Sequence, residues 1–108
     1  MIISFERRDL QQLCCKLEVA EQQLGVVHAQ ALASTIADLE AFNDGAELIG
    51  FFGDEVFIEG DDSLVLPIGS AYRAVFLAAG AKFIRDAAGR VVWSTVTRMK
   101  LMDIVINR

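Results

Sequence analysis

Three cationic residues in the second half of the sequence could bind phosphate: Arg73, Arg98 and Lys100. Arg73 interrupts an apolar run, and a charged side chain there must face solvent or a cleft, because burying it unpaired is costly. Arg98 and Lys100 are two residues apart, so on a strand they fall on the same face. The three cations are predicted to line a phosphate-binding groove, in which the planar, always charged Arg fork is the strongest clamp. The alternative is that they are solvent-facing positions on a half-exposed antiparallel sheet.

Such a groove could cleave RNA without a cofactor. The reaction needs cations that stabilise the developing charge on phosphate, and a group that moves the 2′-hydroxyl proton. The only histidine, His28, is interpreted as a capping or surface residue, and the acidic pairs at 54–55 and 61–62 as parts of a solvated turn. The sequence has no glycine motif for nucleotides, no metal-ligand cluster and no nucleophile elbow, so we expect no cofactor and no metal.

The charge of the chain is unevenly distributed. The net charge is −5 over 108 residues, which argues mildly against nucleic-acid binding. Residues 1–62 hold 3 cations and 13 carboxylates (3 − 13 = −10), whereas residues 63–108 hold 7 cations and 2 carboxylates (7 − 2 = +5). This asymmetry can give one face a positive potential despite the acidic total. The alternative is a helical half with a solvated acidic face and a strand half with scattered basic residues.

The two cysteines, Cys14 and Cys15, are neighbours. Adjacent helical residues point about 100° apart, so a bridge between them would strain the backbone. Cys14 is predicted to be a small core residue and Cys15 to lie at the helix edge, both as free thiols. The N-terminus lacks the apolar run of a signal peptide, and no segment is long enough to span a membrane, so we expect a cytoplasmic protein with no membrane partner.

The hydrophobic pattern predicts two helices followed by strands. One helical stripe begins near Asp9, a candidate N-cap, and ends at Gly25, and a second runs over 29–42. Short apolar runs of strand length follow at 48–52, 56–58, 64–68, 72–78, 82–84 and 91–93. A turn is predicted at 86–89 and a central strand from Met99 to Ile106.

This order of elements predicts one α+β domain over residues 1–108. An N-terminal strand and a helical hairpin would pack on a mostly antiparallel sheet. The first strand, within residues 2–5, is expected to pair with the last.

Residues 86–104 resemble the C-terminal end of HigB-type toxins, a branch of the RelE/ParE superfamily. They contain a turn with glycine, then Trp93, then Val-Thr-Arg-Met-Lys-Leu at 96–101, where those toxins typically have Val-Thr-Arg-Ile-Lys-Ile. Residues 72–76 are similar to the Arg-containing strand of the same proteins. The resemblance covers most of the chain in the order of its elements, and about 35 residues carry specific motif character.

The resemblance implies a helical hairpin on a curved antiparallel sheet and the toxin half of a type II toxin–antitoxin module. Members commonly cleave mRNA on the ribosome and are silenced by an antitoxin protein, so the expected assemblies are a homodimer or a toxin–antitoxin hetero-oligomer. The site would consist of Arg73, Arg98 and Lys100, with Arg108 as a helper. HigB-type toxins commonly end in Asp-Tyr-His; here Ile106, Asn107 and Arg108 take those positions. No general base is therefore assigned.

Two other functions are compatible with the same resemblance. One is a catalytically weak or inactive protein-interaction module with the RelE fold. The other is a ParE-like poison directed at DNA gyrase.

Overall fold

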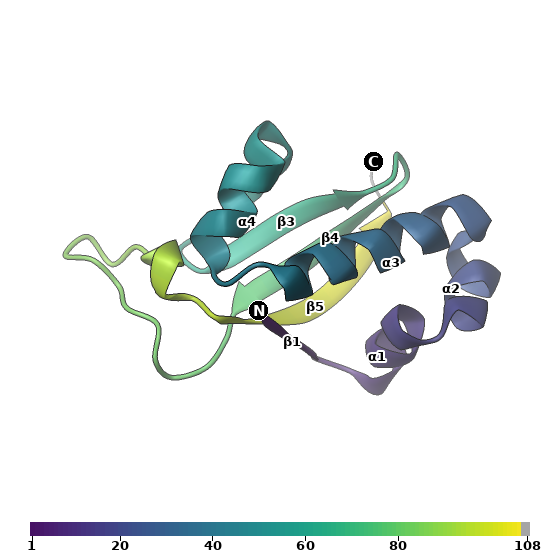
Figure 1. The fold of residues 1–108 in the computed structure, drawn as a ribbon, viewed down its shortest axis with the longest axis horizontal. Coiled ribbons are helices and arrows are strands. Elements are labelled where there is room, and N and C mark those ends of the chain that lie inside the picture. Colours follow the sequence, from purple (N-terminus) through teal and green to yellow (C-terminus); the bar gives the residue numbers. More distant parts are fainter. Residues whose placement is uncertain (107–108) are drawn as a thin grey trace.

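The structure, a computed structural model, describes residues 1–106 and has the α+β composition that the sequence predicts. Its helices are α1 (Arg8–Cys15), α2 (Leu17–Leu24), α3 (Val26–Ala41) and α4 (Gly45–Phe52) (Figure 1). Its strands are β1 (Ile2–Phe5), β2 (Phe57–Glu59), β3 (Ser63–Ile68), β4 (Tyr72–Ala78) and β5 (Arg98–Ile106). Two short 3-10 turns, η1 (Gly53–Glu55) and η2 (Trp93–Thr95), follow α4 and precede β5.

The five strands form one mixed sheet in the order β1-β5-β4-β3-β2. The predicted pairing of the first strand with the last is confirmed, and it is parallel, whereas the other three pairs are antiparallel. The register shifts between Val75 and Phe76, which face Asp103 and Leu101. Met102 is therefore an extra residue on β5, and this bulge changes which residues of the strand face the helices.

The helices pack on one face of the sheet. The side chains with no exposed surface come from both layers and include Leu39 of α3, Leu48 of α4, Phe76 of β4 and Leu101 of β5. Along β5, Met99 and Leu101 are buried, whereas Arg98 is exposed. One side of the sheet is thus core and the other is open. None of the helices within residues 1–106 has the length and apolar character required to cross a bilayer.

The strand predicted over 48–52 is wrong, because these residues form α4. The Asp44 carboxylate accepts a hydrogen bond from the Glu47 backbone N–H (3.0 Å), and the Glu47 carboxylate accepts one from the Asn43 N–H (2.9 Å). The first bond is an N-cap, which satisfies an amide that a new helix leaves without a partner, and the second joins Glu47 to the residue before the cap. Together with the full burial of Leu48, the N-cap outweighs the strand preference of the Ile and Phe side chains.

Three further predictions about local structure are wrong. Residues 82–84 and 91–93 are not strands; they belong to a long loop held by one isolated bridge between Arg85 and Val91. The first helix begins two residues earlier than predicted, with Arg7 at its N-cap rather than Asp9, and it breaks at Lys16 (φ −123, ψ 107). The region predicted to be a hairpin of two helices therefore holds three, α1 to α3, and α4 follows it.

The two cysteines are free, as predicted: Cys14 is half-buried and Cys15 is exposed. Burial raises the pKa of the Cys14 thiol to about 12, with a smaller contribution from the neighbouring Cys15. We expect a disulfide reagent at pH 8 to titrate Cys15 rapidly and Cys14 only as the protein opens, because the thiolate is the reactive form. The Cys15→Ser variant should lose the rapid phase, and two equal rapid phases would contradict the burial of Cys14.

The same shift makes stability depend on pH. In the unfolded chain the Cys14 thiol ionises near its ordinary pKa of 9.0, whereas in the folded protein it stays protonated to about 12. The Cys14 thiol therefore holds its proton more tightly in the folded protein than in the unfolded chain. The stability that this thiol contributes is fully present below pH 9 and is lost as pH rises toward 12.

Candidate functional site

The three predicted cations lie on the open face of the sheet. Arg98 and Lys100 share this face of β5, because Met99 and Leu101 between and beyond them point into the core. Arg73 of β4 is exposed, whereas the next residue, Ala74, is buried. Arg73 pairs with Val105 of β5. Residue parity thus places all three on one side. Arg108, the fourth predicted site residue, lies outside the described residues.

Arg73 does not come together with the other two cations. It pairs with Val105, whereas Lys100 pairs with Leu77, four residues further along β4, and this offset is about 13 Å at ~3.3 Å per residue. The Arg98 carbonyl accepts a hydrogen bond from the Ala79 N–H (2.9 Å), which puts Arg98 about 20 Å from Arg73 by the same rise. A single phosphate cannot contact both arginines in this arrangement.

Lys100 is engaged in an ion pair. Its ammonium lies 3.0 Å from the Glu6 carboxylate, and each side chain keeps 41% of its surface exposed. Nearby, Arg7 lies 3.1 Å from the Asp103 carboxylate. Such half-exposed pairs contribute little to stability, but they reduce the positive potential in the middle of the open face.

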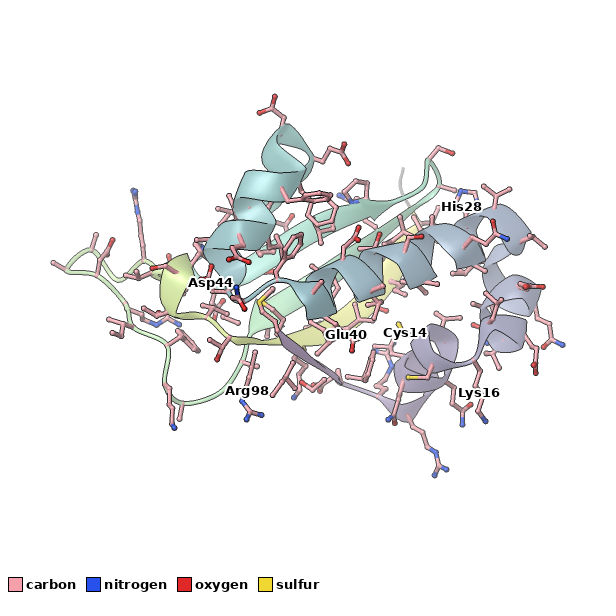
Figure 2. The ribbon with its side chains drawn as sticks, viewed as in Figure 1. Cys14, Lys16, His28, Glu40, Asp44 and Arg98 are labelled. Atoms are coloured by element: carbon pink, nitrogen blue, oxygen red, sulfur yellow. The ribbon has the colours of Figure 1, made fainter. Side chains whose placement is uncertain are left out.

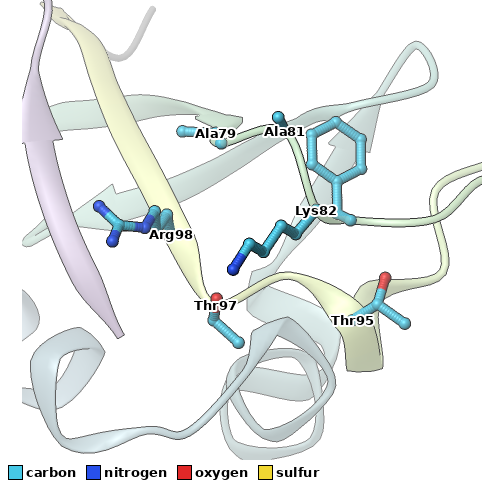
Figure 3. A pocket seen from close by; sticks show the side chains of 8 residues that line it. Ala79, Ala81, Lys82, Thr95, Thr97 and Arg98 are labelled. Atoms are coloured by element: carbon cyan, nitrogen blue, oxygen red, sulfur yellow. The ribbon is translucent and has the colours of Figure 1, made fainter.

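Arg98 lies instead at the rim of a cavity of about 400 Å³ at the start of β5. Lys82 lies at the same cavity, and Figure 3 shows both cationic side chains on the same side of the loop that follows β4. The cavity is also lined by two threonines and one aromatic ring: Thr95, Thr97 and Phe83. We call this the Lys82–Arg98 cavity. Within residues 1–106, neither cation forms an ion pair.

The loop path that brings Lys82 to this place depends on Gly80. Its φ is +87, a left-handed conformation that favours glycine. A Cβ atom there would lie 3.3 Å from Cδ of Arg98, so the absence of a side chain lets the loop turn close beside the arginine. The Thr95 hydroxyl then fixes the loop, since it accepts from the Ile84 N–H (2.9 Å) and donates to the Val92 carbonyl (2.6 Å).

The Thr97 hydroxyl has no hydrogen-bond partner in the described part of the chain. It is therefore available to a ligand, together with the Lys82 ammonium and the Arg98 guanidinium. Two cations and a hydroxyl can hold a phosphate group. The Phe83 ring is the aromatic group of the cavity, and the Arg85 guanidinium carbon lies 5.7 Å from its centroid.

Among the described residues, those that line the cavity include no histidine and no carboxylate. His28 packs elsewhere, with its ring centroid 5.3 Å from that of Tyr72 in an edge-to-face arrangement. The interpretation of His28 as a capping or surface side chain is thus corrected to a half-buried packing residue. Over the residues that the structure describes, no three His, Cys, Asp or Glu side chains gather as metal ligands.

Sequence reasoning missed Lys82, because it assigned this residue to a strand and not to a loop. The adjacent Gly80 was the available signal, since a glycine just after an apolar run often ends a strand. Figure 2 shows Arg98 well away from Lys16 along the molecule, so this site lies far from the junction between α1 and α2.

Fold and site together define an α+β protein with a cationic cavity where β4 ends and β5 begins in a mixed sheet. The chain matches no protein-family model, no curated protein and no solved structure.

Proposed function

We propose that this protein binds single-stranded RNA through the Lys82–Arg98 cavity, as a toxin-like component of a type II toxin–antitoxin module. The supporting observation is the cavity itself, where two cations without ion-pair partners among residues 1–106 lie beside a free hydroxyl and an aromatic ring. Arg98 also belongs to the segment whose sequence resembles HigB-type toxins.

The proposed activity is metal-independent cleavage of mRNA with the ribosome. Lys82 and Arg98 would neutralise the charge that develops on the phosphate as the 2′-oxygen attacks it. Thr97 would donate a hydrogen bond to a phosphate oxygen. The described residues that line the cavity include no histidine and no carboxylate, so no general base is assigned, and the site's proposed contribution is charge stabilisation and positioning.

A second candidate function is a protein-interaction module, and the open face of the sheet favours it. Phe57 is 68% exposed there, next to Val65 and Pro67, in a groove of about 180 Å³ that Arg73 also lines. An antiparallel sheet that faces water usually presents polar residues. Glu55 and Glu59 also line this groove, so its lining combines apolar side chains with one cation and two carboxylates. An antitoxin protein is the partner proposed for it, and Arg73 would act there, away from the phosphate.

RNA binding can be measured by the fluorescence anisotropy of a labelled single-stranded oligonucleotide at several salt concentrations. Removal of either cation, in Lys82→Ala or Arg98→Ala, is expected to weaken binding about tenfold, the usual value of a charged hydrogen bond. The slope of log Kd against log salt should also fall by about 0.7 for each cation that no longer reaches a phosphate. The matched control is the double variant Arg8→Ala, Lys16→Ala, which removes two exposed cations of the α1 region and should bind like the parent.

The activity is tested by tightly induced expression, with growth and mRNA ends followed in one culture. We expect growth arrest and new mRNA ends with the parent, and neither with the Lys82→Ala, Arg98→Ala double variant. Normal growth, intact mRNA and recovery of a bound protein partner would favour the interaction module instead. DNA damage without new mRNA ends would indicate a gyrase poison.

A further inference from the structure

A second cavity, of about 370 Å³, lies between the β2–β3 turn and the loop that precedes β5. The β2–β3 side contributes Ile58 and Asp61, and the loop contributes Asp86, Arg90 and Trp93. Trp93 begins η2, the yellow-green turn beside α4 in Figure 1. The cavity thus combines a large aromatic ring, a guanidinium and two carboxylates, which are the groups that recognise a nucleobase.

Trp93 is held rigidly by the first residue of α4. A Cβ atom on Gly45 would lie 2.9 Å from Cε3 of Trp93 and equally close to its carbonyl oxygen, so the indole packs directly on the glycine backbone. The Gly45 N–H also donates to the Val96 carbonyl (2.9 Å), which ties α4 to the residues after the tryptophan. The half-buried ring is therefore fixed in position where it lines the cavity.

The polar groups of the cavity have free hydrogen-bonding capacity. The Arg90 side chain forms no ion pair with any residue from 1 to 106. One oxygen of Asp86 accepts the backbone N–H groups of Ala88 and Arg90 (2.9 and 3.0 Å), which fixes this carboxylate at the turn. Its other oxygen, and the exposed carboxylate of Asp61, are without hydrogen bonds in the described structure.

We propose that this cavity binds a guanine base of single-stranded RNA. The Arg90 fork matches the O6 and N7 acceptors of guanine, and the carboxylates match its N1–H and N2–H₂ donors. Adenine would place its 6-amino donor against the guanidinium, and a pyrimidine has no N7. A guanine in a duplex is excluded as well, because its Watson–Crick edge is already paired.

This inference rests on the proposed function and names part of the substrate. The two cavities flank one loop, since the Val92 N–H donates to the Ile84 carbonyl (2.9 Å) and the Ile84 N–H to the Thr95 hydroxyl (2.9 Å).

Trp93 is the only tryptophan of the chain, so its fluorescence reports directly on this cavity. Three labelled oligonucleotides of equal length would be titrated: all uridine, or with one central guanosine or adenosine. The guanosine oligonucleotide is expected to bind about tenfold more tightly than the other two, in the range of one stacked and hydrogen-bonded base, and to quench Trp93 most strongly.

The Arg90→Ala variant should bind all three oligonucleotides within about twofold of one another, while its affinity for the uridine oligonucleotide stays at the parent value. Arg8→Ala, which removes a cation from α1, should keep the preference for guanosine. Equal binding of the three oligonucleotides by the parent, or an unchanged preference in Arg90→Ala, would overturn the guanine site and leave the proposed RNA binding in place. Absence of salt-dependent binding to any oligonucleotide would overturn both.

Discussion

The Phe76→Ala variant is expected to lose about 3–5 kcal/mol of unfolding free energy, the usual cost of removing a fully buried phenyl ring. Phe76 has no exposed surface and lies in the middle of the sheet, between Leu64 of β3 and Leu101 of β5, on the face that the helices cover. Few surrounding side chains can move into the space, because both neighbours are themselves fully buried. The remaining stability would be small for a chain of this length.

Urea titration followed by circular dichroism measures this loss as a lower midpoint at an unchanged slope. Val75→Ala is the matched control, since Val75 is the adjacent residue of β4 on the open face and is only half-buried. Its loss should be less than about 1.5 kcal/mol. If the two variants were equally destabilised, the assignment of one buried and one open face of the sheet would be wrong.

Most of the sheet could be predicted from the sequence because its strands have a period of two. The runs at 64–68, 72–78 and 99–106 alternate or are continuously apolar, and they became β3, β4 and β5. The 48–52 run carried the same signal. Its outcome depended on the N-cap at Asp44 and on the burial of Leu48 against elements distant in the sequence. A local pattern of apolar residues does not contain that information.

In the candidate site too, relations within one strand could be predicted from the sequence, whereas relations between strands and loops could not. Parity put Arg98 and Lys100 on one face, because this relation depends only on the strand period. Parity cannot say how far along a partner strand another residue lies, so it could not show that Arg73 is about 20 Å from Arg98. Lys82 reaches Arg98 only through the turn at Gly80, and the path of a loop follows from the packing of the whole fold.

The asymmetry of charge along the sequence also did not predict where the positive potential lies on the folded protein. The cations of the second half do not form a continuous patch, since Lys100 and Arg85 are paired with Glu6 and Asp62 of the first half. These ion pairs connect segments that are far apart in the sequence. Arg73, Lys82, Arg90 and Arg98 have no such partner within residues 1–106, and of these four cations Lys82 and Arg98 line one and the same cavity.

The Gly69→Ala variant is expected to lose about 2–4 kcal/mol, from the sum of a backbone cost and a steric cost. Gly69 adopts φ +61 in the turn between β3 and β4, where an L-residue costs about 1–2 kcal/mol. A Cβ atom at this position would also lie 2.6 Å from Cδ2 of His28, whose ring is held against Tyr72. The imidazole cannot move aside without giving up that packing.

Gly60→Ala separates these two costs, because Gly60 has nearly the same φ, +63, and no atom within 4 Å of an added Cβ. It should lose only the backbone part, about 1–2 kcal/mol. In a His28→Ala background, Gly69→Ala should cost no more than Gly60→Ala. The cycle of single and double variants should therefore give a coupling of about 1–2 kcal/mol between positions 28 and 69. Strictly additive losses in urea unfolding would mean that His28 does not pack on the turn, and that the start of α3 is not anchored to the β3–β4 hairpin.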